Sequence, residues 1–331
     1  MQNLFLTLTF LVSTSLFAAP MEKLPANPPI PSDNPQTAEK FELGKKLFFD
    51  KRLSKDNTVS CNSCHNVNAG GEDHRSTSKG IKGQLGGRNA PTVWNAAFMS
   101  VQFWDGRAKS LEEQAKGPLI NPIEMGMENH DAVVAKIKRH PEYVEAFEKI
   151  FGKEGVTIDN YAKAVAAYER TLITPNSPFD RYLRGEKKAL NAAAIRGMKK
   201  VEEVGCLACH NGPNFAGPVL PEGTGFYQKF PTFPGTEFDK KYEFSKDLGR
   251  YEVTKNEADK NMFRVQTWRN IALTAPYFHN GKVQSLEEAV RVMAKTQLNK
   301  ELHAGDVADI VAFLKSLSGN RPKQEPPHLP K

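Results

Sequence analysis

Apolar residues recur at helical spacing along much of the chain. Between residues 37 and 49, Leu43 and Leu47 lie one helical turn apart with Phe48 beside them, which predicts a helix with one buried side. Similar patterns and local start and stop signals predict helices over residues 37–49, 130–138, 141–151, 157–173, 192–204 and 304–317.

Two further helices are expected to start at capping boxes, in which a serine is followed three residues later by a glutamate. The boxes lie at 110–113 and 285–288, and the second helix is expected to run through Met293. The glycine- and proline-rich residues 66–96 and 211–270 predict long loops, and strand patterns are few. The sequence therefore predicts a mainly α protein with long loops and little β structure.

The two ends of the chain carry different signals. Residues 1–19 hold an uncharged apolar run followed by small residues, which is typical of a cleaved export signal peptide, although no positive residue precedes the run. The run is shorter than the ~20 apolar residues of a membrane span, so we expect no membrane span in the mature chain. Residues 20–36 hold six prolines and predict an extended, loosely ordered arm, and the tail from Gly319 predicts disorder.

The composition is that of a globular protein long enough for two domains. Of 331 residues, 39% are hydrophobic and 25% are charged. The formal net charge is +7, but the basic residues are spread along the chain, which argues against nucleic-acid binding.

The chemistry of the chain centres on two copies of the motif Cys-x-x-Cys-His. The copies are Cys61, Cys64 and His65, and Cys206, Cys209 and His210. In this motif two thiols can form thioethers with the vinyl groups of a haem, and the histidine becomes the proximal iron ligand. A redox disulfide or half of a zinc site explains less, because histidine follows both pairs. We therefore predict two covalently bound c-type haems, whose ionised propionates would lower the net charge to about +3.

The haem motifs also indicate compartment and domain organisation. Covalent haem attachment takes place outside the bacterial cytoplasm, so the motif and the export signal together indicate the periplasm. A predicted helix precedes each motif, which suggests two related cytochrome c-like units, and residues 174–178 break the helical pattern between them. We predict a signal peptide at 1–19, an N-terminal haem domain at 20–176 and a C-terminal haem domain at 177–331.

Spacing alone does not choose the second ligand of each iron. A haem with two protein ligands only transfers electrons, whereas a haem with an open side can activate a small molecule. The candidate ligands are the methionines and the remaining histidines, His74, His130, His140, His279, His303 and His328.

Several longer motifs resemble those of the bacterial di-haem cytochrome c peroxidases over nearly the whole mature chain. They are Cys61 to His65 with Gly70 and Gly71, Arg88 to Thr92, Gln102 to Arg107, Glu113 to Pro118, Glu124 and Met125, Cys206 to His210, Gly212 to Phe215, and Arg269 to Gly281. The resemblance implies a peroxidatic N-terminal haem and a C-terminal haem that relays electrons from a small cytochrome c or a cupredoxin.

The resemblance also implies roles for single residues near the relay haem. His210 and Met293 would ligate its iron, and a thioether ligand raises the reduction potential. His279 would line this haem, and Trp104 would lie between the two haems as an electron conduit.

At the peroxidatic haem, hydrogen peroxide must lose a proton at one oxygen and gain one at the other, which requires an acid–base group and a hydrogen-bonding partner. The resemblance assigns these roles to Glu124 and Gln114, with Pro118 shaping the pocket. It further implies a homodimer.

A calcium ion is also implied, bound between the domains. Its ligands would be the side chain of Asn89 and the backbone carbonyls of Thr274 and Pro276, since calcium prefers oxygen ligands.

The chain departs from the family at one position. Many members close the peroxidatic iron with a histidine in a loop Thr-Ser-Ile-Gly-His, but here Ile81 follows Gly80. An isoleucine cannot bind iron, so we expect a peroxidatic haem that is open in the oxidised enzyme. The competing hypothesis is that His74, on the same loop, replaces the missing ligand.

Two other functions stay open at this point. A di-haem electron carrier would have two saturated irons and no turnover. A di-haem oxidase that matures a tryptophan-derived cofactor has a tyrosine ligand in place of the methionine, and Met293 argues against it.

Overall fold

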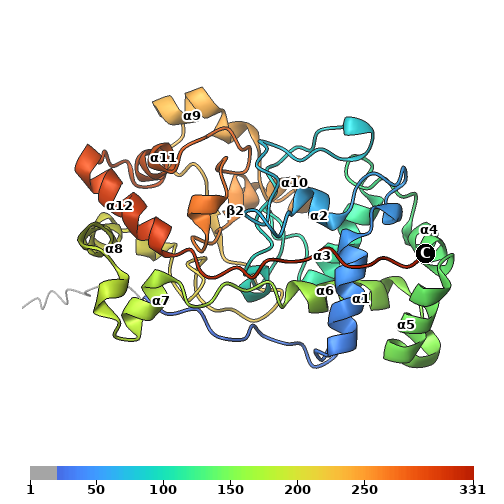
Figure 1. Cartoon of the computed structure of the whole chain (residues 1–331). Helices are drawn as coiled ribbons and strands as arrows, with labels where there is room; N and C mark the ends of the chain where they lie inside the picture. The colour runs from blue at the N-terminus through green and yellow to red at the C-terminus, as the bar shows by residue number, and fades with distance from the viewer. Residues whose placement is uncertain (1–20) are drawn as a thin grey trace, which may run out of the picture.

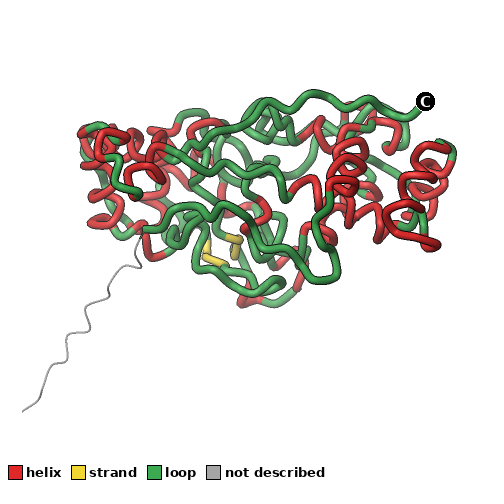
Figure 2. The backbone as a smooth tube through the Cα atoms, turned by 60° about the horizontal axis from the view of Figure 1, so that its bottom comes forward, coloured by secondary structure: helices red, strands yellow, loops and turns green. Residues whose placement is uncertain are grey.

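The computed structural model describes residues 21–331, so the predicted signal peptide lies outside the described residues. Helices gather in two lobes at the two ends of the molecule, and long loops fill the region between them (Figures 1 and 2). No helix within 21–331 is long and apolar enough to cross a membrane. The mainly helical fold with little β structure is confirmed.

The N-terminal lobe is built from six α-helices. They are α1 (Ala38–Phe49), α2 (Cys61–Cys64), α3 (Leu111–Ile120), α4 (His130–Lys138), α5 (Pro141–Phe151) and α6 (Ile158–Glu169). Their apolar faces form one buried core whose members run from Leu43 to Leu172.

The C-terminal lobe holds the other helices and a two-stranded antiparallel sheet. The helices are α7 (Pro178–Leu183), α8 (Ala192–Val204), α9 (Glu237–Tyr242), α10 (Tyr251–Thr254), α11 (Leu286–Leu298) and α12 (Ala304–Ser316). The sheet pairs β1 (Tyr227–Lys229) with β2 (Met262–Arg264). A second core runs from Phe179 to Leu317. The predicted domain boundary, which stays a prediction, falls between the two cores.

Short 3-10 helices occur in the loops of both lobes. They are η1 (Lys51–Leu53), η2 (Ile81–Gly83), η3 (Ala96–Phe98), η4 (Gly152–Glu154), η5 (Lys187–Ala189), η6 (Cys206–Ala208), η7 (Phe244–Lys246), η8 (Glu257–Asp259) and η9 (Ile271–Leu273).

The same helix pairing positions both haem motifs. The helix before each motif, α1 or α8, packs on a later helix, α6 or α12 respectively. A glycine lies at each crossing: a Cβ on Gly44 would meet the carbonyl oxygen of Ala164 at 1.9 Å, and one on Gly197 would meet that of Asp309 at 1.9 Å. Any side chain would therefore push each pair of helices apart.

Most predicted helices are confirmed to within one residue, and the exceptions have local causes. The helix predicted over 157–173 ends at Glu169, because the chain turns there and the Thr171 hydroxyl donates to the carbonyl of Tyr168 at 2.7 Å. Helix α11 continues past Met293 and ends at Leu298. The next residue, Asn299, caps it in the left-handed conformation.

Both predicted capping boxes are only half formed. The hydroxyls of Ser110 and Ser285 each accept a hydrogen bond from the amide three residues later at 3.1 Å, as expected. The carboxylate of Glu113 instead accepts from the amide of Lys109, and that of Glu288 accepts from the hydroxyl of Tyr242.

The two ends of the described chain are extended but not loose, so the predictions of a loosely ordered arm and a disordered tail are wrong. The arm at 21–36 begins on the C-terminal lobe, where the amide of Leu24 donates to Asp180 at 3.0 Å, and ends at α1. The tail at 318–331 leaves α12 and crosses the N-terminal lobe (Figure 1). Backbone and side-chain hydrogen bonds fix both segments, and composition does not reveal these partners.

Candidate active site

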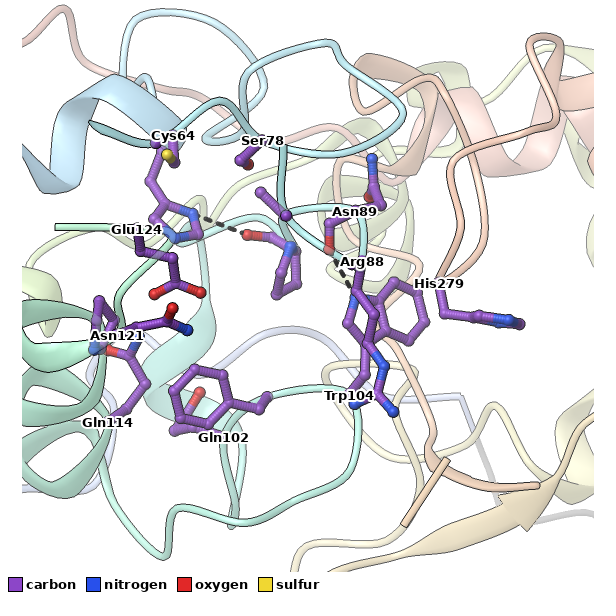
Figure 3. Close-up of a pocket in the computed structure, with 18 of the residues that line it drawn as sticks. Cys64, Ser78, Arg88, Asn89, Gln102, Trp104, Gln114, Asn121, Glu124 and His279 are labelled. Carbon is purple, nitrogen blue, oxygen red and sulfur yellow. Dashed lines mark hydrogen bonds between the residues drawn. The ribbon is translucent and has the colours of Figure 1, made fainter. Parts of the chain in front are cut away.

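A cavity of about 680 Å³ lies at the first haem motif and extends to the C-terminal lobe (Figure 3). The predicted residues on its wall are Cys61, Cys64, His65, Asn89, Trp104, Gln114, Pro118, Glu124 and His279. Folding thus brings together residues from both halves of the sequence.

The first motif forms a single helical turn, α2, which begins after Ser60. The following residue, His65, places its ring nitrogen Nδ1 3.1 Å from the carbonyl oxygen of Pro91. A carbonyl only accepts, so Nδ1 carries the proton and Nε2 stays free to bind a metal.

The second motif repeats this arrangement. Helix α8 ends at Gly205, whose φ of 99° is left-handed, and the chain turns directly into Cys206. The Nδ1 of His210 lies 3.1 Å from the carbonyl oxygen of Phe215, so its Nε2 is also free. The ring of His210 stacks on Trp268 at a centroid distance of 4.3 Å.

These residues fit covalently bound haem. The four cysteines form no disulfide, and each is partly buried, as a thiol at the edge of a cofactor site would be. Burial raises the pKa of the Cys61 thiol to about 12. Burial also lowers the pKa of both histidines, to about 4 for His210, so each is the neutral imidazole that binds iron.

Met293 lies on α11 in the C-terminal lobe. Its half-buried side chain packs against the same core as Cys206 and Trp268. This position is compatible with ligation of the second haem beside His210, which stays a prediction.

The residues predicted to handle the peroxide protons and shape the pocket lie on α3 and the turn after it. Gln114 and Pro118 are one helical turn apart, and the amide of Gly126 donates to the carbonyl of Asn121 at 2.8 Å, which closes the turn. Figure 3 shows the side chains of Gln114, Asn121 and Glu124 together on one part of the wall.

The carboxyl group of Glu124 is one of several titratable groups on this wall whose pKa burial shifts. Burial raises its pKa, and the positive charge of Arg107 opposes part of this effect. A half-buried carboxyl with a raised pKa is suited to accept and return a proton.

Ser78 and Gly80 line the cavity, but Ile81 on the same loop does not. Ile81 is 3% exposed, belongs to the N-terminal core and donates its amide to the carbonyl of Glu124 at 2.9 Å. A Cβ on Gly126 would meet Cδ1 of Ile81 at 2.1 Å. His74 is exposed and lies outside the cavity wall, with its Nδ1 3.1 Å from the carbonyl oxygen of Ala275.

Trp104 lies between the cavity and the C-terminal core. It lines the cavity, packs against the core of the C-terminal lobe, and donates from Nε1 to the carbonyl oxygen of Asn89 at 2.8 Å. The ring of His279 meets it edge-on at 6.2 Å. His279 is 2% exposed, and its Nε2 has no hydrogen-bond partner among residues 21–331. Its predicted place beside the relay haem stays a prediction.

The predicted calcium ligands lie near the junction of the lobes. Asn89 is 6% exposed, and its amide nitrogen Nδ2 donates to the carbonyl oxygen of Arg75 at 2.8 Å. Its backbone amide donates to the carbonyl of His279 at 2.7 Å, close in sequence to Thr274 and Pro276. Among residues 21–331 no three His, Cys, Asp or Glu side chains gather as a metal site, but calcium at this position would use amide and carbonyl oxygens.

The sequence reasoning missed several residues on the cavity wall. Asn121, Arg107 and the 5% exposed Glu169 line the same cavity. Glu169 could have been found, because it continues the buried i, i+4 row of Tyr161 and Val165 on α6.

Comparison with known proteins identifies the family. The sequence model of the di-haem cytochrome c peroxidases matches residues 38–188. The cytochrome c551 peroxidase of Pseudomonas aeruginosa is 50% identical, over 89% of this chain and 83% of that protein. The chain belongs to the di-haem cytochrome c peroxidase family. A second relative in this family, the cytochrome c551 peroxidase of Nitrosomonas europaea, is 48% identical over 91% of this chain and 86% of that protein.

More distant relatives are similar to the whole chain as well. The methylamine utilization protein MauG of Methylorubrum extorquens is 33% identical, over 92% of this chain and 86% of that protein. The crystal structure of a MauG-like protein associated with microbial copper homeostasis superposes with a TM-score of 0.77 at 29% identity, covering 90% of this chain and 95% of that chain. The chain thus shares its fold with this MauG-like protein.

Proposed function

We propose that the protein is a periplasmic di-haem cytochrome c peroxidase, which reduces hydrogen peroxide to water with electrons from a small cytochrome c or a cupredoxin. The observation that carries this proposal is the cavity that holds the motif from Cys61 to His65 together with the half-buried carboxyl group of Glu124. An electron carrier needs no acid–base group beside its haem. The cavity therefore supports a site that handles protons as well as electrons.

The reaction balances as one hydrogen peroxide, two electrons and two protons giving two waters. When bound, the N-terminal haem would supply an iron that binds peroxide, and the two haems together would supply both electrons. Glu124 would accept the proton from the peroxide oxygen nearer the iron and return it to the farther oxygen, which then leaves as water. The amides of Gln114 and Asn121 would orient the peroxide by hydrogen bonds, and Pro118 shapes the same wall.

We propose that no protein ligand blocks the peroxidatic site in the oxidised enzyme. The burial of Ile81 in the core and the position of His74 outside the cavity support this. Electron paramagnetic resonance of the fully oxidised holoenzyme should give one high-spin and one low-spin ferric haem. Two low-spin signals would contradict an open site.

The C-terminal site would be the electron relay, with His210 and Met293 as ligands and Trp104 between the lobes as the conduit. A calcium ion on Asn89, Thr274 and Pro276 would stabilise the junction of the lobes, and the enzyme would act as a homodimer.

The proposed reaction is tested with the holoenzyme, a reduced small cytochrome c and hydrogen peroxide. Two cytochromes should be oxidised per peroxide consumed, and none when peroxide is omitted. A di-haem electron carrier would show no peroxide-dependent oxidation, and that result would reject the proposed function.

A further inference from the structure

Arg88 joins the two lobes beside Trp104. Its guanidinium donates to Asp105, the residue after Trp104, at 2.6 Å. On its other side it forms a two-point ion pair with Asp247 of the C-terminal lobe, with both distances 2.7 Å. Asp105 is 3% exposed and Arg88 is 19% exposed, so solvent screens these contacts little. One side chain therefore connects the turn that carries Trp104 to the other lobe.

Hydrogen bonds between Trp104 and two other segments hold the same turn. The indole of Trp104 donates to the carbonyl of Asn89, the neighbour of Arg88, at 2.8 Å. The amide of Arg264, on strand β2, donates to the carbonyl of Trp104 at 2.8 Å. Figure 3 shows Arg88, Asn89 and Trp104 on the side of the cavity that faces His279. Segments of both lobes thus contact the Trp104 residue and hold it in place.

The backbone of this turn adopts a conformation that it would not hold alone. Phe103 has a φ of 67°, which is rare for a bulky residue, and Gly106 has a φ of 66°. Such strained backbone persists where surrounding contacts determine it. Loss of the Arg88 contacts would let the turn relax and Trp104 move.

We propose that Arg88 is a positioning residue that fixes Trp104 between the two lobes for electron transfer to the peroxidatic site. This inference rests on the proposed function, in which Trp104 is the conduit. Arg88 itself need not touch peroxide or take part in proton transfer. Because a displacement of ~1 Å can slow a positioned reaction by up to ~100-fold, loosening the indole should slow the internal electron step about tenfold.

The test compares Arg88→Gln, Arg88→Lys and Asp247→Asn holoenzymes with the wild type. Arg196→Gln is the matched control, because Arg196 forms the same two-point pair with Asp309, also at 2.7 Å, but within the C-terminal lobe. Steady-state kinetics give kcat and kcat/KM for peroxide. Hydrogen exchange of the Arg264 amide measures whether the loop that carries Trp104 stays in place, and it does not depend on catalytic activity.

We expect Arg88→Gln and Asp247→Asn to lower kcat about tenfold with kcat/KM for peroxide unchanged, since the first reaction with peroxide precedes the internal electron step. Arg88→Lys should recover part of kcat, the Arg264 amide should lose protection in Arg88→Gln, and Arg196→Gln should match the wild type. Unchanged kcat, an equal fall in kcat/KM, or full protection of the Arg264 amide would overturn the proposal.

The two proposals fail in different ways. If the wild type shows no peroxide-dependent turnover, the proposed function fails, whereas exchange at the Arg264 amide still tests the contact made by Arg88. If the wild type turns over and the Arg88 and Asp247 variants equal it, only the role of Arg88 is rejected.

Discussion

Two carboxyl groups on the wall of one cavity have different surroundings. Glu124 is half-buried. Burial raises its pKa, and the positive charge of Arg107 lowers it in part. Glu169 is 5% exposed, its Oε2 has no hydrogen-bond partner in the described part of the chain, and burial raises its pKa to about 8. We assign proton transfer to Glu124, because it lies with Gln114 and Asn121.

Replacing Glu124 by glutamine should lower kcat by about 100- to 10,000-fold, because glutamine is isosteric but cannot carry the proton. In the wild type, the rate should fall as the pH drops through the raised pKa of Glu124, since only the carboxylate accepts a proton. Steady-state rates from pH 4 to 8 measure both effects. Glu128→Gln is the control, because Glu128 is exposed on the same loop. An active Glu124→Gln enzyme would contradict this assignment.

Glu169 should make the folded protein less stable as the pH rises, whereas the carboxylate of a surface ion pair has the opposite effect. Its folded pKa is raised above the unfolded value, so the folded protein binds the extra proton and is favoured at low pH. The contribution of Glu169 to the free energy of unfolding should be fully present below about pH 4 and lost as the pH rises through about 8. The groups that surround it are Arg170, Glu112, Cys61, Tyr161 and Tyr168.

Glu169→Gln should therefore gain stability relative to the wild type as the pH rises from 5 to 8. The difference in Tm between the two holoenzymes over this range isolates the carboxyl group from the other titrating residues. A difference that is constant with pH would show that Glu169 stays ionised when folded.

At the residue scale, chemistry that depends on local spacing could be predicted from sequence. The thiols and histidine of each haem motif lie within five residues, so their joint role is visible in the chain itself. The carbonyl groups that orient the histidines are different: that of Pro91 lies 26 residues from His65, and only the folded backbone brings them together. Glu124 and Gln114 were identified by resemblance alone, because a single glutamate carries no signal of burial.

At the scale of elements, each lobe depends on one close helix crossing. Helix α1 approaches α6 at Gly44, and α8 approaches α12 at Gly197. Each of these helices leads into a haem motif, so its position sets the position of the cysteines. The two crossings are the structural basis of the repeat that the sequence suggested.

Gly44→Ala and Gly197→Ala should each destabilise the protein by about 1–3 kcal/mol or more, because the added methyl group meets backbone rather than a movable side chain. Gly305→Ala is the control: Gly305 lies in α12 with no atom within 4 Å of an added Cβ, so alanine should be neutral or slightly stabilising. Chemical denaturation of the three holoenzyme variants measures the changes. Equal free energies of unfolding for all three variants would mean that the helices can move apart at the crossings without loss of stability.

The existence of long helices was predictable, and some of their ends were not. Helix α6 stops at Glu169 although the apolar Leu172 follows closely, because the Thr171 hydroxyl donates to the carbonyl of Tyr168 and the chain turns there. The loops of 211–270 contain β1, β2, α9 and α10, which are too short to leave a periodic pattern.

At the scale of the whole molecule, two extended segments connect the lobes. The arm at 21–36 runs from Asp180 to α1, and the tail at 318–331 runs from α12 over the N-terminal lobe. In the tail, Gln324 and Asn68 exchange two hydrogen bonds of 2.8 Å, and Arg52 donates to the carbonyl of Pro330 at 2.8 Å. These contacts hold the lobes around the cavity between them.

Removing residues 321–331 should lower Tm by a few degrees, because several hydrogen bonds worth about 0.5–1.5 kcal/mol each are lost from the N-terminal lobe. Calorimetry of the truncated holoenzyme measures the shift. Lys323→Ala is the control, since that exposed side chain pairs with Glu325 of the same tail. An unchanged Tm would show that the tail rests on the lobe without stabilising it.

The tail also shows why composition misled the prediction at this scale. A segment rich in proline and lysine has too little apolar surface to fold by itself, and disorder follows if no partner is present. Here the partner is the other lobe of the same chain, and its polar groups satisfy the backbone of the tail. Such a surface exists only after both lobes have folded.

Turnover of the fully oxidised holoenzyme, without prior reduction, tests the proposed open peroxidatic site most directly. With reduced cytochrome c and hydrogen peroxide, the oxidised enzyme should react without a lag and at the rate of enzyme reduced in advance, because Ile81 cannot bind iron and we propose that no other protein group does. Turnover that appears only after prior reduction would contradict the proposed open site.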